Sequence, residues 1–218
     1  MAEGEFPVFW SFRRCPYAMR ARLALKAAGQ RVWLREILLR DKPAAFLAVA
    51  SDGTVPVLVL PDAPPDAAVI AESRDIMLWA LGRADPQGWL FGLSSAQIDA
   101  HFDQLDGPFK YHLDRYKYAS RFDRAEAAEH RRAAAEIAKV WDQRLAAQPA
   151  LSGNRPGLLD YASLPFVRQF RIADPPWFDA QDWPHLASWL TAFLESAQLA
   201  AIMEKYPLWQ EGEAGFVF

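Results

Sequence analysis

The chain reads SFRRCPYAMRARL over residues 11–23, where a strand-like pattern gives way to a helix-like one. Residues 6–12 are mostly apolar and aromatic, as in a buried strand. Cys15 follows, and Pro16 is a residue type favoured at the first position of a helix. A cysteine at a helix start meets unsatisfied backbone N–H groups and the positive end of the helix dipole, and both favour the thiolate. A lone cysteine is as often a small buried apolar residue, so Cys15 alone leaves a reactive and a structural interpretation open.

Strand and helix patterns continue outward from this segment. The helix beginning at Pro16 should extend to about Gly29, with its basic residues away from the apolar face: Arg20, Arg22 and Lys26. The following elements are expected to be a strand at 32–38, a helix at 42–49, strands at 57–60 and 69–71, and a helix at 73–82. This order predicts a mixed four-stranded sheet with helices against it, over residues 1–83.

The rest of the chain has a helical pattern. Residues 84–93 are typical of a linker, and strand patterns largely disappear after them. Apolar residues then recur at helical spacing, most clearly at Leu186, Trp189, Leu190, Phe193 and Leu194. Helices are expected over residues 94–120, 124–148, 160–172 and 184–205. Residues 94–218 are therefore predicted to form an all-α second domain.

The composition excludes several classes of function. The net charge of -3 over 218 residues gives no basic surface for nucleic acid. Cys15 is the single cysteine, so no disulfide can form within one chain. The four histidines share no ligand spacing, so we expect no metal site. Residues 1–5 lack a signal-peptide pattern and polar residues interrupt the apolar segment 187–203, so we expect a cytoplasmic protein that binds no membrane.

Two dipeptides have the chemistry to bind parts of a peptide ligand. Pro56 opens a strand after a glycine turn, which is compatible with a cis bond that leaves the Val55 backbone at an open strand edge. Glu72 and Ser73 stand between a strand and a helix, where a hydroxyl and helix N–H groups bind a carboxylate and Glu72 can meet an ammonium group. Each motif alone is common, since most such prolines only start strands and Ser73 could be an ordinary helix cap.

The motifs together resemble those of the glutathione transferases, whose thioredoxin-like N-terminal domain precedes an all-helical C-terminal domain. They are Cys-Pro-Tyr-Ala at 15–18, Val-Pro at 55–56 and Glu-Ser at 72–73. The resemblance covers essentially the whole chain. Residues 11–23 and 41–43 look most like the cysteine-type omega class, in an omega-like member of bacterial style. The resemblance implies an α+β thioredoxin-like domain over 1–83 that binds glutathione, followed by an all-helical domain over 94–218.

The resemblance implies that Cys15 forms a mixed disulfide with glutathione, the co-substrate. Val55 would pair through its backbone with the cysteinyl part of glutathione, and Pro56 would be cis. Glutaredoxins often have a second cysteine where this chain has Ala18. A single protein thiol must therefore be regenerated by a second glutathione.

The two ends of glutathione would have separate partners. The resemblance implies that Lys42 binds the glycyl carboxylate, and that Glu72 and Ser73 hold the γ-glutamyl end. These residue types suit the ligand, because two anionic groups and one ammonium group would meet a lysine, a helix start and a glutamate.

The resemblance also locates a second-substrate pocket between the two domains. The candidates to line it are Phe12, Arg13, Tyr111, Tyr116 and Tyr118. Aromatic residues at helical spacing are more often core, and we expect that for most of them. The second substrate would be a small electrophile or disulfide.

One feature of the second domain departs from the family pattern. Its helices usually carry a capping box that begins with a serine or threonine, and here Gly157 replaces that residue ahead of Asp160. We expect Asp160 to accept a backbone N–H and the helix to keep a weaker cap.

The leading hypothesis is a glutathione-dependent thiol transferase or reductase that works through Cys15. Conjugation of glutathione to electrophiles, as in other transferases, is the alternative enzyme function. A non-catalytic interaction module of the same fold is a third possibility, which the retained Lys42, Val55, Glu72 and Ser73 disfavour. The resemblance further implies a homodimer with a role in detoxification.

Overall fold

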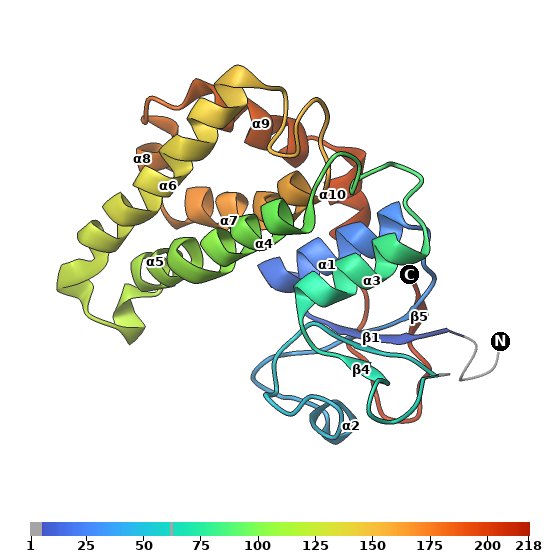
Figure 1. Cartoon of the computed structure of the whole chain (residues 1–218). Helices are drawn as coiled ribbons and strands as arrows, with labels where there is room; N and C mark the ends of the chain where they lie inside the picture. Colours follow the sequence, from blue (N-terminus) through green and yellow to red (C-terminus); the bar gives the residue numbers. More distant parts are fainter. Residues whose placement is uncertain (1–5, 62) are drawn as a thin grey trace. The chain divides into compact units, whose positions relative to one another are not determined.

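The computed structural model describes residues 6–61 and 63–218 and divides into two compact units (Figure 1). Unit 1 contains the residues up to Gln87 together with Ala197–Phe218, and unit 2 contains Gly88–Ser196. The sequence analysis assigned residues 197–218 to the helical domain, whereas in the structure they belong to unit 1. The signal-peptide expectation concerns residues 1–5, which lie outside the described residues.

Unit 1 is built on a sheet in the order β4-β3-β1-β2-β5. Its strands in the described chain are β1 (Val8–Ser11), β2 (Trp33–Glu36), β3 (Val57–Val59), β4 (Val69–Ile70) and β5 (Phe216–Val217). β1 pairs in parallel with β2, and the other three pairings are antiparallel. The four predicted strands and the mixed sheet are confirmed.

The fifth strand was not predicted. β5 has two residues, which is too short for an alternating pattern. It approaches β2 so closely at Gly215 that a side-chain Cβ there would lie 2.6 Å from the Leu34 carbonyl oxygen. Gly215 also has a φ of 111°, a conformation that glycine adopts without steric cost. The glycine therefore allows the C-terminal segment to add a strand to the sheet.

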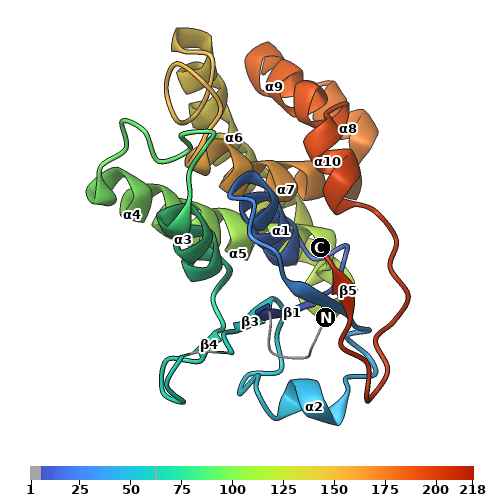
Figure 2. The same ribbon diagram turned by 90° about the vertical axis from the view of Figure 1, so that its right-hand side faces the viewer.

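Helices cover both faces of the sheet. Those of unit 1 are α1 (Pro16–Ala27), α2 (Ala44–Leu47), α3 (Ser73–Arg83) and α10 (Ala197–Ile202). α1 and α3 lie on one face and α2 on the other, and α10 packs beside α1 (Figure 2). α1 ends where Gly29 takes a φ of 62°, as its sequence predicts.

Two arginines of α1 are buried, contrary to prediction. Arg20 and Arg22 were expected away from the apolar face, but they are 1% and 0% exposed. The reason is that α3 and α10 both pack against α1. Arg22 donates to Ser11 Oγ at 2.9 Å and to the Ile202 carbonyl at 3.0 Å, and it forms an ion pair with Glu36.

The Arg22–Glu36 pair connects four elements of unit 1. Burial raises the pKa of the Glu36 carboxyl, and the guanidinium of Arg22 opposes this rise. Glu36 Oε1 also accepts the backbone N–H of Arg13 at 2.6 Å, and Arg13 Nη1 donates to the Met203 carbonyl at 3.3 Å. The network therefore joins the ends of β1 and β2 to α1 and to the C-terminal end of α10.

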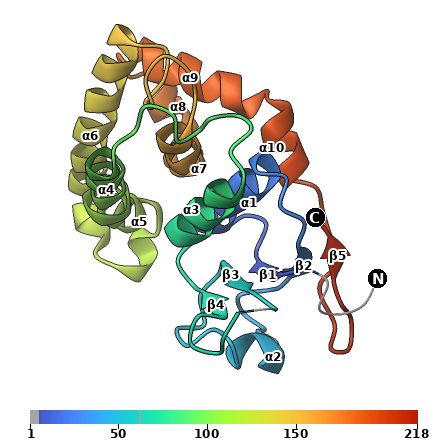
Figure 3. The same cartoon turned by 45° about the vertical axis from the view of Figure 1, so that its right-hand side comes forward.

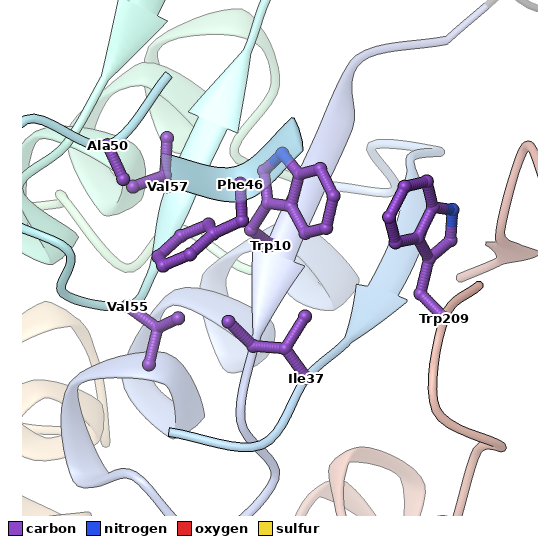
Figure 4. Close-up of a cluster of buried hydrophobic side chains, with 7 residues drawn as sticks. All are labelled: Trp10, Ile37, Phe46, Ala50, Val55, Val57 and Trp209. Carbon is purple, nitrogen blue, oxygen red and sulfur yellow. The ribbon is translucent and has the colours of Figure 1, made fainter. Parts of the chain in front are cut away.

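The other face of the sheet carries an apolar cluster that includes Trp209 from the C-terminal segment (Figure 4). Its buried members are Trp10, Ile37, Phe46, Ala50, Val55, Val57 and Trp209. The rings of Trp10 and Trp209 meet edge to face at 4.9 Å, and those of Trp10 and Phe46 lie 5.6 Å apart. The C-terminal segment thus contributes Trp209 to the apolar cluster that also holds the Val55 side chain.

Unit 2 is helical. Its α-helices in the described chain are α4 (Ser95–Gln104), α5 (Lys110–Lys117), α6 (Ala127–Ala147), α7 (Leu158–Ala173), α8 (Pro175–Asp179) and α9 (Pro184–Leu194). Shorter turns are the π-helix η1 (Leu105–Phe109) and the 3₁₀ helices η2 (Ala119–Arg121) and η3 (Arg124–Glu126). α7 is the most buried, and α4, α5, α8 and α9 pack around it (Figure 3). None of the described helices combines the length and the apolar character needed to span a membrane.

Two long predicted helices are broken. The helix expected over 94–120 is interrupted at η1, where Gly107 leaves helical geometry and Pro108 has no N–H to donate. The helix expected over 184–205 ends at Leu194, and the Ser196 hydroxyl donates to the Phe193 carbonyl at 2.7 Å. α8 was not predicted, because five residues show little periodicity.

The cap at the start of α7 is stronger than expected. Asp160 accepts the backbone N–H groups of Leu151, Ser152 and Gly157 at 2.7, 2.9 and 3.0 Å. Ser152 Oγ accepts the Leu159 N–H at 3.1 Å, so a hydroxyl from the preceding loop replaces the one absent at Gly157. A Cβ at Gly157 would lie 3.0 Å from that same oxygen, which explains the glycine.

Replacing Arg22 by Met should lower the free energy of unfolding by about 3–5 kcal/mol, because Glu36 would stay buried without its cation. Urea denaturation followed by circular dichroism measures the loss. Lys26→Met is the control, since Lys26 is exposed on the same helix, and it should cost about 1 kcal/mol or less. Equal stability of Arg22→Met and wild type would contradict the role of the pair. The double variant Arg22→Met/Glu36→Leu should recover much of the loss.

Candidate functional site

The sheet pairing brings four chain segments together at one end of the strands, the end that leads to Cys15, and this end of the sheet is called the thiol edge below. β3 is antiparallel to both β1 and β4, so its start lies beside their ends, as the pairs Trp10–Val57 and Leu58–Ile70 show. β2 is parallel to β1 and ends beside it, at the pair of Ser11 with Glu36. The segments that leave or enter the strands at this edge carry all six residues predicted to react with or bind glutathione: Cys15, Lys42, Val55, Pro56, Glu72 and Ser73.

Cys15 occupies the N-cap of α1, and its side chain makes no capping hydrogen bond. The thiol is half-buried, and Sγ lies 3.7 Å from the Val55 carbonyl oxygen, within the range of a weak S–H···O hydrogen bond. The first turn of α1 contains no acidic side chain. The positive end of the helix therefore acts on Cys15 without an opposing carboxylate in that turn.

The side chain of Val55 is anchored in the core, whereas its backbone lies just before the first pair of the β3 ladder. The Val55–Pro56 bond is cis, as predicted. The Val55 side chain is buried in the cluster with Trp10 and Phe46 (Figure 4). The β3 ladder begins only at Val57, so the backbone of Val55 precedes it. An anchored residue just outside a ladder is suited to pair with an extended peptide.

Lys42 lies beside the loop that leads to Val55. It follows β2 and lies two residues before the start of α2. A Cβ built on Gly53 would be 3.3 Å from Lys42 Nζ, so the ammonium group lies against the turn two residues before Val55. Lys42 is half-buried. The position brings a positive charge to the same loop that Cys15 contacts.

Ser73 and Glu72 form the start of α3, which has no side-chain cap. Ser73 is 2% exposed, and its Oγ accepts the Nε–H of Arg20 at 3.0 Å. A hydroxyl that accepts from an arginine keeps its own hydrogen to donate to an anion. Glu72 is exposed. The uncapped helix start, the serine hydroxyl and the glutamate are thus present together.

Arg20 is a residue of this edge that the sequence reasoning missed. Its buried guanidinium fixes the Ser73 hydroxyl and lies 4.9 Å from the centre of the Tyr17 ring. The available signal was a pair of basic residues inside an otherwise apolar helix. Only the packing of α1 against α3 shows that Arg20 donates a hydrogen bond to the Ser73 hydroxyl.

Phe12 and Arg13 lie in the loop before Cys15. The guanidinium of Arg14 lies 5.6 Å from the Phe12 ring centre. Arg13 is directed to α10, where it donates to the Met203 carbonyl. Neither arginine is shown to act on the Cys15 thiol.

The three tyrosines predicted for a second-substrate pocket belong to unit 2. Tyr111 is 48% exposed, and the Tyr118 hydroxyl accepts from Gln169 Nε2 at 3.4 Å. Tyr116 packs against Phe170 with ring centres 5.9 Å apart, and burial raises the pKa of its hydroxyl. Tyr116 therefore has a core role within unit 2. The pocket itself stays a prediction.

Among the residues that the structure describes, no group of three or more histidine, cysteine or carboxylate side chains is arranged to hold a metal ion. Two histidines of unit 2 do meet, His112 and His130, whose Nδ1 atoms lie 2.9 Å apart. Burial and the neighbouring His130 lower the pKa of His112. The two rings share a hydrogen bond that joins α5 to α6.

Comparison with protein families decides the classification. Models of the N-terminal and C-terminal domains of glutathione S-transferases match residues 9–88 and 124–192. The chain belongs to the glutathione S-transferase superfamily. None of the curated proteins compared with it by sequence gives a significant match.

Solved structures agree with this transferase fold. A glutathione transferase family member from Pseudomonas fluorescens Pf-5 with two glutathione molecules bound superposes with a TM-score of 0.78 at 18% identity, covering 94% of this chain and 95% of that one. A theta-class enzyme from Xanthomonas axonopodis pv. citri with glutathione bound gives 0.68 at 21% identity, covering 92% and 98%. A serine-to-cysteine mutant of poplar glutathione transferase F1 gives 0.75 at 16% identity, covering 91% and 96%. At these identities the likeness concerns the fold.

Proposed function

We propose that this glutathione S-transferase is a cysteine-type enzyme of the omega-like branch that transfers thiols through Cys15. The observation that carries the proposal is the position of the Cys15 thiol, at the start of a helix whose first turn has no acidic side chain and 3.7 Å from the Val55 carbonyl oxygen. A thiolate is the nucleophile in thiol–disulfide exchange, and the helix start favours it. The position also puts the sulfur beside the backbone on which a bound peptide would lie.

The reaction has two exchange steps. The Cys15 thiolate attacks the glutathione sulfur of a glutathionylated substrate, so the substrate's S–S bond breaks and its thiolate leaves and takes up a proton. Cys15 is then joined to glutathione by a disulfide. The thiolate of a second glutathione attacks the glutathione sulfur of this bond, releasing oxidised glutathione and the Cys15 thiolate. The substrate is released as a thiol, one free glutathione is oxidised and joins the glutathionyl unit in oxidised glutathione, and no second protein thiol takes part.

The residues around Cys15 complement glutathione along its length. Val55 would pair with the cysteinyl backbone, Lys42 would meet the glycyl carboxylate, and the start of α3 would hold the γ-glutamyl carboxylate. Ser73 supports this because its hydroxyl can donate while it accepts from Arg20. Glu72, exposed beside it, would pair with the γ-glutamyl ammonium group. Such charge-assisted bonds are about twice as strong as neutral ones.

Lys42→Ala should weaken glutathione binding about tenfold, the value of one charge-assisted hydrogen bond. Calorimetric titration with reduced glutathione measures the change. Lys139→Ala, at an exposed position of α6, removes the same charge from unit 2 and should leave the affinity unchanged. Equal affinities for both variants would contradict the assignment of Lys42.

Cys15→Ser should lower the rate of glutathione-dependent reduction of a mixed disulfide by about a thousandfold or more, since a hydroxyl cannot form the covalent intermediate. The assay uses glutathionylated 2-mercaptoethanol as substrate and follows oxidised glutathione. Glutathione affinity, measured by calorimetry, should change by less than about threefold, because the substitution nearly preserves side-chain size. This control separates loss of chemistry from loss of the site.

Conjugation to an aromatic halide is measured on the same Cys15 variant. The proposal expects it to persist or rise, as in transferases that use a serine. Unaltered disulfide reduction in Cys15→Ser would reject the thiol-transfer mechanism. Absence of glutathione binding in wild type would instead favour a non-catalytic module.

A further inference from the structure

A cavity of about 310 Å³ lies in unit 2, between the segment before α4 and the loop before α7. Its lining residues come from 88–92 and from 152–157, and four of the nine are glycines, so the backbone forms much of its walls. The volume is near the lower limit of sites for small molecules, roughly 300–1,000 Å³. All the lining residues belong to unit 2, whereas the residues predicted to bind glutathione belong to unit 1.

Arg155 joins the two walls of this cavity. Its Nη2 donates to the Gly88 carbonyl oxygen at 3.2 Å, and its Cζ lies 5.3 Å from the centre of the Phe91 ring. A side chain at position 88 would clash with the guanidinium, which explains the glycine there. The two contacts hold the guanidinium at the cavity, and one hydrogen bond uses only one of its five N–H donors.

The charge of the cavity is positive. Arg155 forms no ion pair within residues 6–61 and 63–218, and none of the lining residues is acidic. Leu90 and Pro156, the two residues of these segments that are not part of the lining, are apolar. Asp160, the carboxylate nearest to Arg155 in sequence, is buried and already accepts three backbone N–H groups and the indole N–H of Trp189. Its charge is therefore compensated inside the core, and the guanidinium of Arg155 stays available to a ligand.

The loop before α7 supplies further donors. Ser152 Oγ accepts the Leu159 N–H at 3.1 Å, so the hydroxyl keeps its own hydrogen to donate. The backbone N–H groups of Asn154 and Arg155 have no acceptor in the part of the chain that the structure describes. The Gly88 carbonyl oxygen, by contrast, already accepts two N–H groups. The cavity thus offers a cation and hydrogen-bond donors, which is an environment for an anion.

A phosphate group suits this donor set better than a carboxylate. Phosphate esters present three strong acceptor oxygens, whereas a carboxylate presents two in one plane. The donors are a guanidinium, a hydroxyl and successive backbone N–H groups, and such groups form anion-binding concavities in loops. The ring of Phe91 is 78% exposed beside the guanidinium, so it offers an apolar surface to an organic group attached to the phosphate.

We propose that this cavity binds a small phosphate monoester. The phosphate accepts from the guanidinium of Arg155, from the Ser152 hydroxyl and from the backbone N–H groups of residues 154 and 155. The organic group lies against Phe91. The inference goes beyond the proposed function and does not rest on it, because every residue that takes part belongs to unit 2.

The test is an NMR titration of the isotope-labelled full chain with n-butyl phosphate, inorganic phosphate and pentanoate as probes. The backbone N–H signals of Asn154 and Arg155 report binding at this cavity. Butyl phosphate should shift them with a dissociation constant below about 1 mM at low ionic strength. Inorganic phosphate should bind at least about threefold more weakly, because it lacks the apolar group that meets Phe91. Pentanoate should bind at least about tenfold more weakly.

Two variants separate the parts of the cavity. Arg155→Gln should weaken the binding of butyl phosphate about tenfold or more, and the fold should not change because Arg155 is exposed. Phe91→Ala should remove the preference for butyl phosphate over inorganic phosphate and leave the affinity for inorganic phosphate within about threefold. Arg132→Gln, at an exposed position of α6, is the charge-matched control and should have no effect.

Three results would overturn the proposal: no shift of the signals from residues 152–157 at millimolar butyl phosphate, equal affinities for pentanoate and butyl phosphate, or unchanged butyl phosphate binding in Arg155→Gln. Shifts at Lys42 and Ser73 in place of residues 152–157 would also overturn it, by assigning the phosphate to the thiol edge.

Discussion

The pairing of β1 with β3 is the constraint on which the candidate site depends. Because these strands are antiparallel and Trp10 lies opposite Val57, the chain that leaves β1 must pass the chain that enters β3. Cys15 and Val55 meet for that reason, at 3.7 Å between sulfur and carbonyl oxygen. The antiparallel β3–β4 pair then brings the start of α3 to the same edge, and the parallel β1–β2 pair brings Lys42 there. A shift of register by one residue would turn every side chain of β3 to the other face of the sheet.

The last part of the chain supports this edge from both sides of the sheet. On one side, Arg22 links Ser11 and Glu36 to the end of α10. On the other, Trp209 packs on Trp10 in the cluster that holds Val55. β5 adds to this by closing the edge of β2. The C-terminal segment is therefore a structural part of unit 1, although the helical unit separates the two in sequence.

Local chemistry explains what could be predicted from the sequence. Three of the motifs act through the residues directly beside them. The proline after Cys15 begins a helix, the Val55–Pro56 bond is cis, and Glu72 and Ser73 begin another helix. Their assigned roles toward glutathione stay predictions, since they concern a ligand. The sequence did not reveal the burial of Arg20 and Arg22, because this follows from α3 and α10 packing on α1. β5 was not predicted for the same reason, because a two-residue strand is defined only by its pairing with β2.

The central claim is that Cys15 reacts with a glutathione that lies along Val55. A crystal structure of the protein equilibrated with oxidised glutathione tests it most directly. The account predicts a disulfide between Cys15 Sγ and the glutathione sulfur, with the cysteinyl backbone paired to Val55 and the γ-glutamyl carboxylate at Ser73. Glutathione bound elsewhere, or an unmodified Cys15 with the tripeptide sulfur directed away from it, would contradict the account.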